Sequence, residues 1–270
     1  MRSIALAMAT AALLISAPAT AADMRMPIKA APMAAPIFNW TGFYIGGFFG
    51  GAAADRNATS TEPCTVPGCL SLFPVAGGVT PNIYSLGNSF IGGGTVGYNW
   101  QLPGSQLVLG LEGEAGYLHL QRTVRDINAP PPALGSGHFD STRLGDFYGV
   151  LAARLGFAVD RVLFYGKGGV AFVDKEHNYS SVLPPGSATL NNSHTQTTWA
   201  AGAGLEWAFA SNWTLKGEYL YLATRETYAT AGTCVGGLPF PFGCGGGIPL
   251  TSTHTDPGIH TGKFGVNYRF

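Results

Sequence analysis

The sequence predicts an all-β fold: an eight-stranded antiparallel up-and-down transmembrane β-barrel with long extracellular loops. Charged residues make up only 11% of the chain, whereas soluble domains carry about 25%. Glycine, with 39 of 270 residues, has about twice its usual share, and aromatic residues reach 12%. Beyond the N-terminus no stretch has about 18 consecutive apolar residues, which excludes helical spans. A closed barrel is the other structure that satisfies every backbone group in lipid.

The N-terminal residues 1–21 are typical of an export signal peptide. Arg2 supplies a positive start, Ile4 to Ile15 form a short apolar stretch, and Ala19-Thr20-Ala21 is a small-x-small cleavage pattern. The apolar stretch is shorter than the roughly 20 residues that a spanning helix needs. Residues 22–38 are rich in Pro and Ala and have no periodicity. We therefore expect a cleaved signal, an extended periplasmic segment, and one barrel domain over residues 39–270.

Eight segments alternate with period two, are rich in aromatic and β-branched residues, and are bounded by turn residues, as strands are. They are Trp40–Gly51, Phe90–Gln101, Gln106–Leu118, Arg143–Ala158, Val162–Val173, Thr197–Ala210, Trp213–Ala223 and Thr261–Phe270. Short connections at 102–105, 160–161 and 211–212 alternate with long ones at roughly 52–89, 119–142, 174–196 and 224–260. Short periplasmic turns and long extracellular loops are typical of outer-membrane barrels, and an even strand number places both ends of the domain on the periplasmic side.

The bulky apolar face of these segments is predicted to point outward into lipid. An eight-stranded barrel is just wide enough inside for side chains to fill it, and the opposite face carries mostly Gly, Ala and Thr. The outward aromatics form two belts, as in a spanning barrel. The belt beside the short turns contains Phe43, Trp100, Phe157, Phe164, Trp207, Phe209, Trp213, Tyr268 and Phe270, and the belt beside the long loops contains Phe49, Phe90, Tyr117, Phe147, Trp199 and Tyr221. A soluble barrel or sandwich with these aromatics inside is the alternative.

Ten charged residues fall on the predicted inward face, five acidic and five basic. They are Glu112, Glu114, Asp146, Glu206 and Glu218 against Arg154, Lys167, Lys216, Lys263 and Arg269. A charge in a narrow, poorly hydrated space must be paired and hydrogen-bonded, because its desolvation cost otherwise dominates. The balance predicts an internal salt-bridge network that closes the lumen.

The four cysteines form two local pairs, Cys64 with Cys69 and Cys234 with Cys244. Because an exported chain meets an oxidising periplasm, two short-loop disulfides are the favoured interpretation, although the sequence allows three pairings. Zinc is disfavoured, since the spacings do not match a metal motif and no His stands at ligand spacing. No cofactor is predicted. The formal net charge is zero, and without a basic stripe nucleic acid is not expected as a partner.

Several motifs together resemble the alpha-proteobacterial outer-membrane β-barrel family, whose members are called outer-membrane immunogenic or porin-family proteins. They are Asn39–Gly46 (NWTGFYIG), Gly97–Gln101, Ala153–Gly156, Gly202–Glu206, Glu218–Tyr221 and Gly265–Phe270. The resemblance covers nearly all of the mature chain and implies a small barrel in the outer membrane of a Gram-negative bacterium. The C-terminal segment with Phe264, Val266, Tyr268 and Phe270 resembles the signal read by the barrel-assembly machinery. The first and fourth long loops are longer than the family pattern, so loop-borne roles do not carry over.

Three functions follow as hypotheses. The preferred one is a non-enzymatic barrel with a closed, charge-paired lumen and a structural, envelope-integrity or surface-interaction role. Its partners would be outer-membrane lipids and lipopolysaccharide, the barrel-assembly machinery during folding, and an unknown ligand at the extracellular loops. A narrow porin-like channel is the alternative, although wide channels need about 16 strands. A lipid-modifying enzyme is disfavoured because the histidines lie in or beside long loops without a paired nucleophile: His119, His138, His177, His194, His254 and His260.

Overall fold

The computed structural model of the protein describes residues 38–61, 81–125, 137–183, 186–234 and 248–270. Within these ranges it contains twelve strands. The same residues include no helix that is long and apolar enough to cross a bilayer. The predicted signal peptide and all but the last residue of the predicted periplasmic segment lie outside the described residues. The strands are β1 (Gly42–Ala54), β2 (Ala58–Thr61), β3 (Asn82–Tyr84), β4 (Asn88–Gln101), β5 (Leu107–Arg125), β6 (Gly137–Val159), β7 (Val162–Leu183), β8 (Gly186–Ala208), β9 (Trp213–Leu222), β10 (Thr227–Cys234), β11 (Ile248–Thr255) and β12 (Ile259–Arg269).

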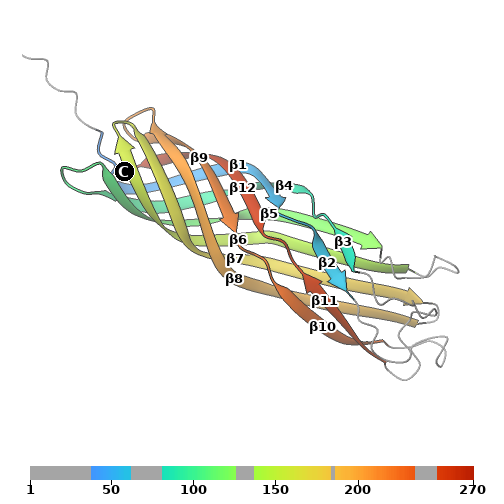
Figure 1. The fold of residues 1–270 in the computed structure, drawn as a ribbon. Coiled ribbons are helices and arrows are strands. Elements are labelled where there is room, and N and C mark those ends of the chain that lie inside the picture. Colours follow the sequence, from blue (N-terminus) through green and yellow to red (C-terminus); the bar gives the residue numbers. More distant parts are fainter. Residues whose placement is uncertain (1–37, 62–80, 126–136, 184–185, 235–247) are drawn as a thin grey trace, which may run out of the picture. The chain divides into compact units, whose positions relative to one another are not determined.

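Eight of these strands close into one antiparallel barrel in the order β1-β12-β9-β8-β7-β6-β5-β4 (Figure 1). The first and last strands complete the ring, with Phe49 opposite Phe264. Each of the eight predicted segments contributes one strand, so the predicted eight-stranded antiparallel barrel is confirmed. Closure leaves the ring without an unpaired sheet edge in the bilayer.

Two of the four predicted long loops are mostly strand. β5 to β8 run for 19 to 23 residues, about twice the 9–11 that cross a bilayer. The ladder between β5 and β6 continues to Arg125 opposite Phe139, and that between β7 and β8 to Leu183 opposite Gly186. The parts of these strands that lie farther from the C-terminal end of the barrel are rich in Ser, Thr, Asn and His. They therefore lack the alternation of apolar and polar residues by which a half-buried strand is recognised. The prediction of loops at 119–142 and 174–196 was therefore wrong for most of their length.

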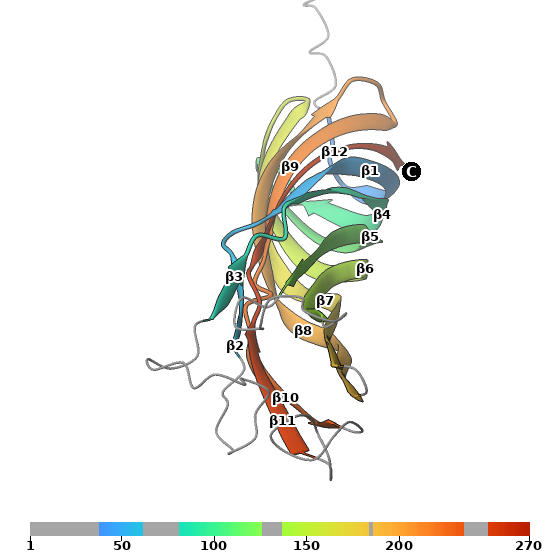
Figure 2. The ribbon, with the colours of Figure 1, turned by 90° about the vertical axis from the view of Figure 1, so that its right-hand side faces the viewer.

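The other two long connections contain a second, four-stranded sheet with the order β10-β11-β2-β3. Figures 1 and 2 show it at the end of the barrel opposite the C-terminus, beyond the ends of β1, β4, β9 and β12. Side chains connect it to the long strands: Tyr84 Oη and Thr142 Oγ1 lie 2.7 Å apart, and Asn82 Nδ2 donates to Asp140 Oδ2 at 2.8 Å. β2 and β3 have only 4 and 3 residues, and the 8-residue β10 (TYATAGTC) and β11 (IPLTSTHT) lack the regular alternation of bulky apolar residues by which strands are predicted.

The barrel wall separates an aromatic outer face from a filled interior. Phe43, Phe49 and Trp199 are 63%, 61% and 58% exposed, whereas Tyr44 and Phe48 beside them in β1 are buried. Tyr221 and Tyr268 of the two belts are only partly exposed, since Trp199 and Trp213 pack against them with ring centroids 5.7 and 5.1 Å apart. Large apolar side chains are thus exposed around the cylinder, as the bilayer requires.

Candidate functional site

The end of the barrel interior nearest the C-terminus is closed by Trp40, which is fully buried. Its backbone N–H donates to Gln101 Oε1 at 2.9 Å, and its indole Nε1 donates to the carbonyl of Asp160 at 3.3 Å. It belongs to an apolar cluster with Val108, Ala158, Leu163, Tyr165 and Ala208. Trp40 was predicted as the first residue of the first strand. The strand instead begins at Gly42, and the preceding residues turn into the lumen.

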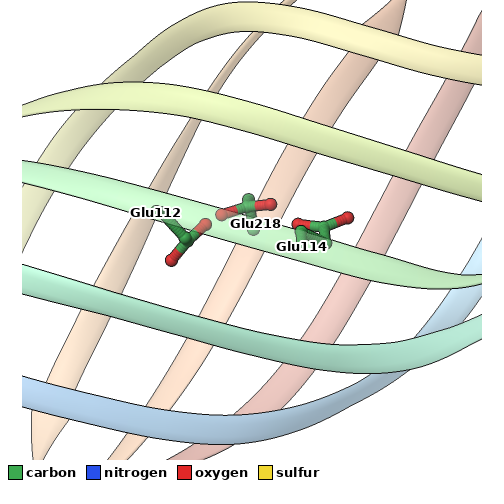
Figure 3. A group of neighbouring side chains, drawn as sticks. All are labelled: Glu112, Glu114 and Glu218. Atoms are coloured by element: carbon green, nitrogen blue, oxygen red, sulfur yellow. The ribbon is translucent and has the colours of Figure 1, made fainter.

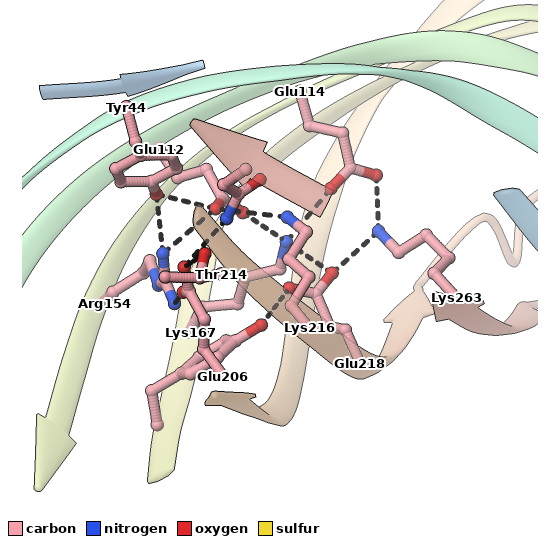
Figure 4. Close-up of polar contacts among 12 residues, drawn as sticks. Tyr44, Glu112, Glu114, Arg154, Lys167, Glu206, Thr214, Lys216, Glu218 and Lys263 are labelled. Carbon is pink, nitrogen blue, oxygen red and sulfur yellow. Dashed lines mark hydrogen bonds and ion pairs between the residues drawn. The ribbon is translucent and has the colours of Figure 1, made fainter. Parts of the chain in front are cut away.

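The middle of the interior holds eight buried charges from six strands (Figure 4). They are Glu112 and Glu114 of β5, Arg154 of β6, Lys167 of β7, Glu206 of β8, Lys216 and Glu218 of β9, and Lys263 of β12. The four carboxylates and four cations balance, and each has a partner within 4 Å. Period-two alternation positions them, because every second side chain of a barrel strand points inward. We call this set the lumen network.

Arg154 connects two carboxylates on different strands. Its Nη1 lies 3.2 Å from Glu112 Oε2 and its Nη2 donates to Glu206 Oε2 at 2.9 Å. The other oxygen of Glu206 accepts from Thr214 Oγ1 at 2.5 Å and from Asn267 Nδ2 at 2.9 Å. The buried charges are therefore hydrogen-bonded as well as paired, which is what repays part of their desolvation cost.

Figure 3 shows the carboxylates of Glu112, Glu114 and Glu218 converging inside the barrel, and the ammonium of Lys167 contacts all three. Its Nζ lies 2.8 Å from Glu112 Oε1, 3.1 Å from Glu114 Oε2 and 2.7 Å from Glu218 Oε1. The three acidic groups converge closely enough to coordinate a metal ion. The ammonium already contacts all of them, so in this arrangement the cation among the carboxylates belongs to the protein.

Three tyrosines complete the network, and none of them was predicted as a site residue. Tyr44, Tyr148 and Tyr165 donate from their hydroxyls to Glu112, Glu114 and Glu218 at 2.7, 2.7 and 2.8 Å. The guanidinium of Arg154 lies 3.8 Å from the ring centroid of Tyr165. Each tyrosine lies at an inward position between outward-facing neighbours. The alternation of inward and outward positions along a strand, which we call strand parity, could therefore have identified it.

Inward glycines make room for these rings. A Cβ on Gly97 would lie 2.4 Å from the Tyr44 ring, and one on Gly204 would lie 2.6 Å from the Tyr165 hydroxyl. Real Cβ atoms do not approach so closely. Some of the high glycine content therefore serves the packing of the lumen rather than turns.

An apolar layer covers the network on the side away from the C-terminus. It includes Phe48, Ile91, Leu118, Leu120, Leu144, Leu220, Leu222 and Ile259, all buried in one cluster. With Trp40 below and this cluster above, the charged layer is enclosed at both ends. The interior resembles a packed core rather than a pore.

Nine of the ten predicted lumen charges are buried inside the barrel; Asp146 is not. Its carboxylate is 39% exposed and contacts Arg143 and, at 2.6 Å, His119 Nδ1. Gly145 and Asp146 both have positive φ (108° and 76°), and the register shifts between Leu144 and Tyr148. This bulge moves Asp146 out of the inward alternation. The prediction for Asp146 was wrong because strand parity was counted through the irregularity.

Arg269 is buried but has no ion pair among the described residues. Its Nη2 donates to the carbonyl of Asn39 at 2.7 Å, and its guanidinium lies over the rings of Phe38 and Trp40 at 4.7 and 5.3 Å. The predicted inward position is therefore correct, whereas the predicted pairing is replaced by carbonyl and aromatic contacts. Arg269 stabilises the plug at the C-terminal end.

A second polar cluster lies between the long strands and the four-stranded sheet. The rings of His177 and His254 stack with centroids 4.0 Å apart, and both side chains are fully buried. Thr142 Oγ1 lies 3.2 Å from His177 Nδ1 and 3.1 Å from His254 Nε2, and Asp256 contacts His254 and Lys175 at 2.9 and 2.7 Å. Both histidines were predicted to lie in or beside long loops. Their contact could not be predicted, because only the folded chain brings residues this distant in the sequence together.

The electrostatics of this second cluster keep the imidazole of His177 neutral. Burial, reinforced by the neighbouring His254, lowers the pKa of His177 from 6.5 to about 3. Although burial acts in the opposite direction, the hydrogen bond with His254 and the charge of Lys175 hold the pKa of Asp256 below its ordinary value. At neutral pH the cluster therefore contains the ionised carboxylate of Asp256 and the uncharged ring of His177.

Two further predictions remain open. Cys64, Cys69 and Cys244 lie outside the described residues, and of Cys234 only the backbone is described, so the disulfides stay predictions. Phe264, Val266 and Phe270 of the predicted assembly signal are exposed on the outer face of β12 and the following C-terminal residue, and Tyr268 is partly buried. Their recognition by the assembly machinery also stays a prediction.

Comparison with known proteins gives consistent matches. The model of the outer membrane protein beta-barrel domain matches residues 7–270. The 31 kDa outer-membrane immunogenic protein of Brucella melitensis is 33% identical over 220 residues, covering 79% of this chain and 84% of that protein. The 25 kDa outer-membrane immunogenic protein of Brucella canis is 28% identical over 235 residues, covering 85% and 89%. The crystal structure of the outer membrane protease OmpT from Escherichia coli covers 85% of this chain and 97% of its own, with 11% identity and a TM-score of 0.40.

Proposed function

Since the chain belongs to the alpha-proteobacterial family of outer-membrane β-barrel proteins, we propose that it is a non-conducting scaffold of the outer membrane, with a role in envelope integrity or surface interaction. The observation that most supports this proposal is that side chains fill the lumen. Trp40, the lumen network and the apolar layer follow one another along the axis. Ion passage would require several buried pairs to separate, and breaking a buried pair costs about 3–5 kcal/mol.

The extracellular part supports a surface role. The four-stranded sheet and the long strands β5 to β8 raise a large polar body above the outer aromatic belt. Loops and edges displayed on a rigid scaffold are where binding residues concentrate. The loops with the cysteines continue from this body, so we keep them as the contact surface for an unidentified ligand.

Planar-bilayer recording tests the closed lumen against the porin-like alternative. Refolded protein should give no stable conductance steps under conditions in which a wide porin gives them. A matched variant, Trp40→Ala combined with Lys167→Ala, removes the plug and the central ammonium and should show leakage. Stable steps from the unmodified barrel would defeat the closed-lumen proposal and favour the channel.

The geometry of the second polar cluster argues against a hydrolase. Thr142, His254 and Asp256 offer a hydroxyl, an imidazole and a carboxylate, but the same His254 nitrogen, Nε2, faces both Thr142 and Asp256. A catalytic base uses one ring nitrogen for the nucleophile and the other for the carboxylate. The three side chains are also buried. Incubation with labelled lipid A should release no acyl chain; single-turnover release would restore the enzymatic alternative.

A further inference from the structure

Two exposed arginines converge on one buried carboxylate at the extracellular rim of the barrel. Asp55 directly follows β1, and its side chain is only 4% exposed. Arg225 Nη2 contacts Asp55 Oδ2, and Arg56 Nε lies 3.7 Å from Asp55 Oδ1, while the two arginine side chains stay 47% and 56% exposed. We call Asp55, Arg56 and Arg225 the rim cluster.

The carboxylate of the rim cluster is already committed to other donors. Asp55 accepts from the backbone N–H of Gly258 at 2.9 Å and from Tyr221 Oη at 3.2 Å. These contacts join the end of β1 to the start of β12 and to β9. Asp55 therefore neutralises one guanidinium at most, and the cluster keeps a net positive charge. Most of the N–H donors of the two exposed arginines have no acceptor among the described residues.

An aromatic platform lies directly below the rim cluster, on the outer face. His260 Nδ1 lies 2.6 Å from Tyr219 Oη, and its ring centroid is 5.1 Å from that of Tyr221. Trp199 packs on the other side of Tyr221, with centroids 5.7 Å apart. Such belts mark the headgroup level of a bilayer. The two arginines thus stand at the height of the lipid headgroups of the outer leaflet.

The opposite part of the rim has a different charge balance. Arg143, on β6, contacts two carboxylates, Asp146 and Glu176, and Asp174 accepts from Thr195 Oγ1 at 2.6 Å. The guanidinium of Arg143 is therefore already matched by carboxylates. By contrast, the rim cluster beside β1, β9 and β12 has two guanidiniums for one carboxylate, which favours the binding of an anion at this position.

From these observations we infer that the rim cluster and its aromatic platform bind the phosphorylated sugar headgroup of an outer-leaflet glycolipid. Guanidinium groups bind phosphate through paired N–H donors, and basic pockets at the headgroup level are a recurring lipid-binding device. Arg56 and Arg225 would contact the phosphate. His260 and Tyr219 would lie against the sugar, with the acyl chains on the aromatic belt. This goes beyond a passive scaffold, since it ties the barrel to one lipid species.

The test compares lipid binding by full-length protein in phosphatidylcholine nanodiscs. Bisphosphorylated lipid A is the probe, lipid A stripped of phosphate is its matched control, and retention is read by native mass spectrometry. The double variant R56Q/R225Q should bind the phosphorylated lipid at least about ten-fold more weakly, as expected when charged hydrogen bonds are lost. R161Q removes one guanidinium at the β6–β7 turn on the opposite end of the barrel, as R56Q alone does at the rim, and should bind like the unmodified protein.

Faster migration on a gel before boiling checks that each variant is folded. If the double variant does not fold, R56Q alone suffices, because Arg56 makes only the 3.7 Å contact with Asp55. Equal binding by the double variant and the unmodified protein, or equal binding of the phosphate-free lipid, would overturn the inference. Displacement of the lipid by equimolar inorganic phosphate would reassign the site to free phosphate and overturn the glycolipid assignment.

Discussion

Lys167 Nζ of β7 and Glu218 Oε1 of β9 lie 2.7 Å apart across the barrel interior. The same ammonium contacts Glu112 and Glu114, so one cation serves three carboxylates. All four side chains are buried inside the barrel. The relationship makes Lys167 the residue on which the charge balance of the lumen network most depends.

Replacing Lys167 by Met should destabilise the barrel strongly. The side-chain volume is nearly kept, but three carboxylates lose their common cation, and an unbalanced buried charge costs about 3–5 kcal/mol. Urea unfolding in lipid vesicles, followed by gel shift, measures the change. Adding Glu112→Gln restores neutrality and should recover part of the loss. An unchanged urea midpoint in the single variant would show that the network contributes little to stability.

The alanine substitution Gly204→Ala should destabilise, whereas Gly166→Ala should not. On Gly204 a Cβ would meet the Tyr165 hydroxyl at 2.6 Å and the carbonyl of Gly217 at 2.7 Å, but on Gly166 the nearest atom is 3.9 Å away. Overpacking of this kind costs about 1–3 kcal/mol. The two glycines belong to neighbouring β7 and β8, so the pair separates interior packing from loss of a glycine as such. Equal urea midpoints for the two variants would contradict this account.

The bulge in β6 predicts a sharper contrast between two glycines of one strand. Gly145 has φ of 108°, and a Cβ there would lie 1.8 Å from the carbonyl of Leu118. Gly145→Ala should therefore fold poorly or lose more than about 2 kcal/mol. Gly149→Ala is the control, because its Cβ would meet the carbonyl of Glu114 at an ordinary 3.7 Å. Comparable folding yields for both would mean that β6 can do without the bulge.

Strand parity explains how much of this molecule could be predicted from its sequence. In the membrane, one face must be apolar, so alternation assigns Glu112 and Lys167 inward and Phe43 outward without knowledge of the fold. The alternation fails at Asp146, because Gly145 and Asp146 both have positive φ and lie in the bulge between Leu144 and Tyr148, where the alternation is interrupted. The sequence contains no pair of glycines that would have indicated this bulge. The alternation also fails above the membrane, where both faces are polar and the second sheet forms.

The second polar cluster shows the other limit. His177 and His254 are 77 positions apart in sequence numbering and come from strands of different sheets. Neither has a motif around it, and each alone is typical of a solvated loop. Their stacking follows from the approach of β11 to β6 and β7, which is a tertiary contact. The pattern of a single sequence carries no information on contacts between distant strands, so a buried site formed by such contacts cannot be predicted from it.

That cluster predicts a loss of stability in mild acid. In the unfolded chain the pKa of His177 is 6.5, and in the folded chain it is about 3. Between these values the unfolded state binds a proton that the folded state excludes, so stability is complete above pH 6.5 and declines as the pH falls towards 3. At about 1.4 kcal/mol per pKa unit, the loss by pH 4.5 is roughly 2–3 kcal/mol.

Urea midpoints measured at pH 7.5 and pH 4.5 report this loss. Both pH values lie above the range in which Asp256 becomes protonated. His177→Gln keeps a polar side chain but cannot bind the proton, so its midpoint should change much less between the two pH values. His194→Gln, at a partly exposed position on neighbouring β8, is the matched control and should keep the full dependence. If His177→Gln retained it as well, the acid sensitivity would belong to other groups, and the buried imidazole stack would be stable to protonation.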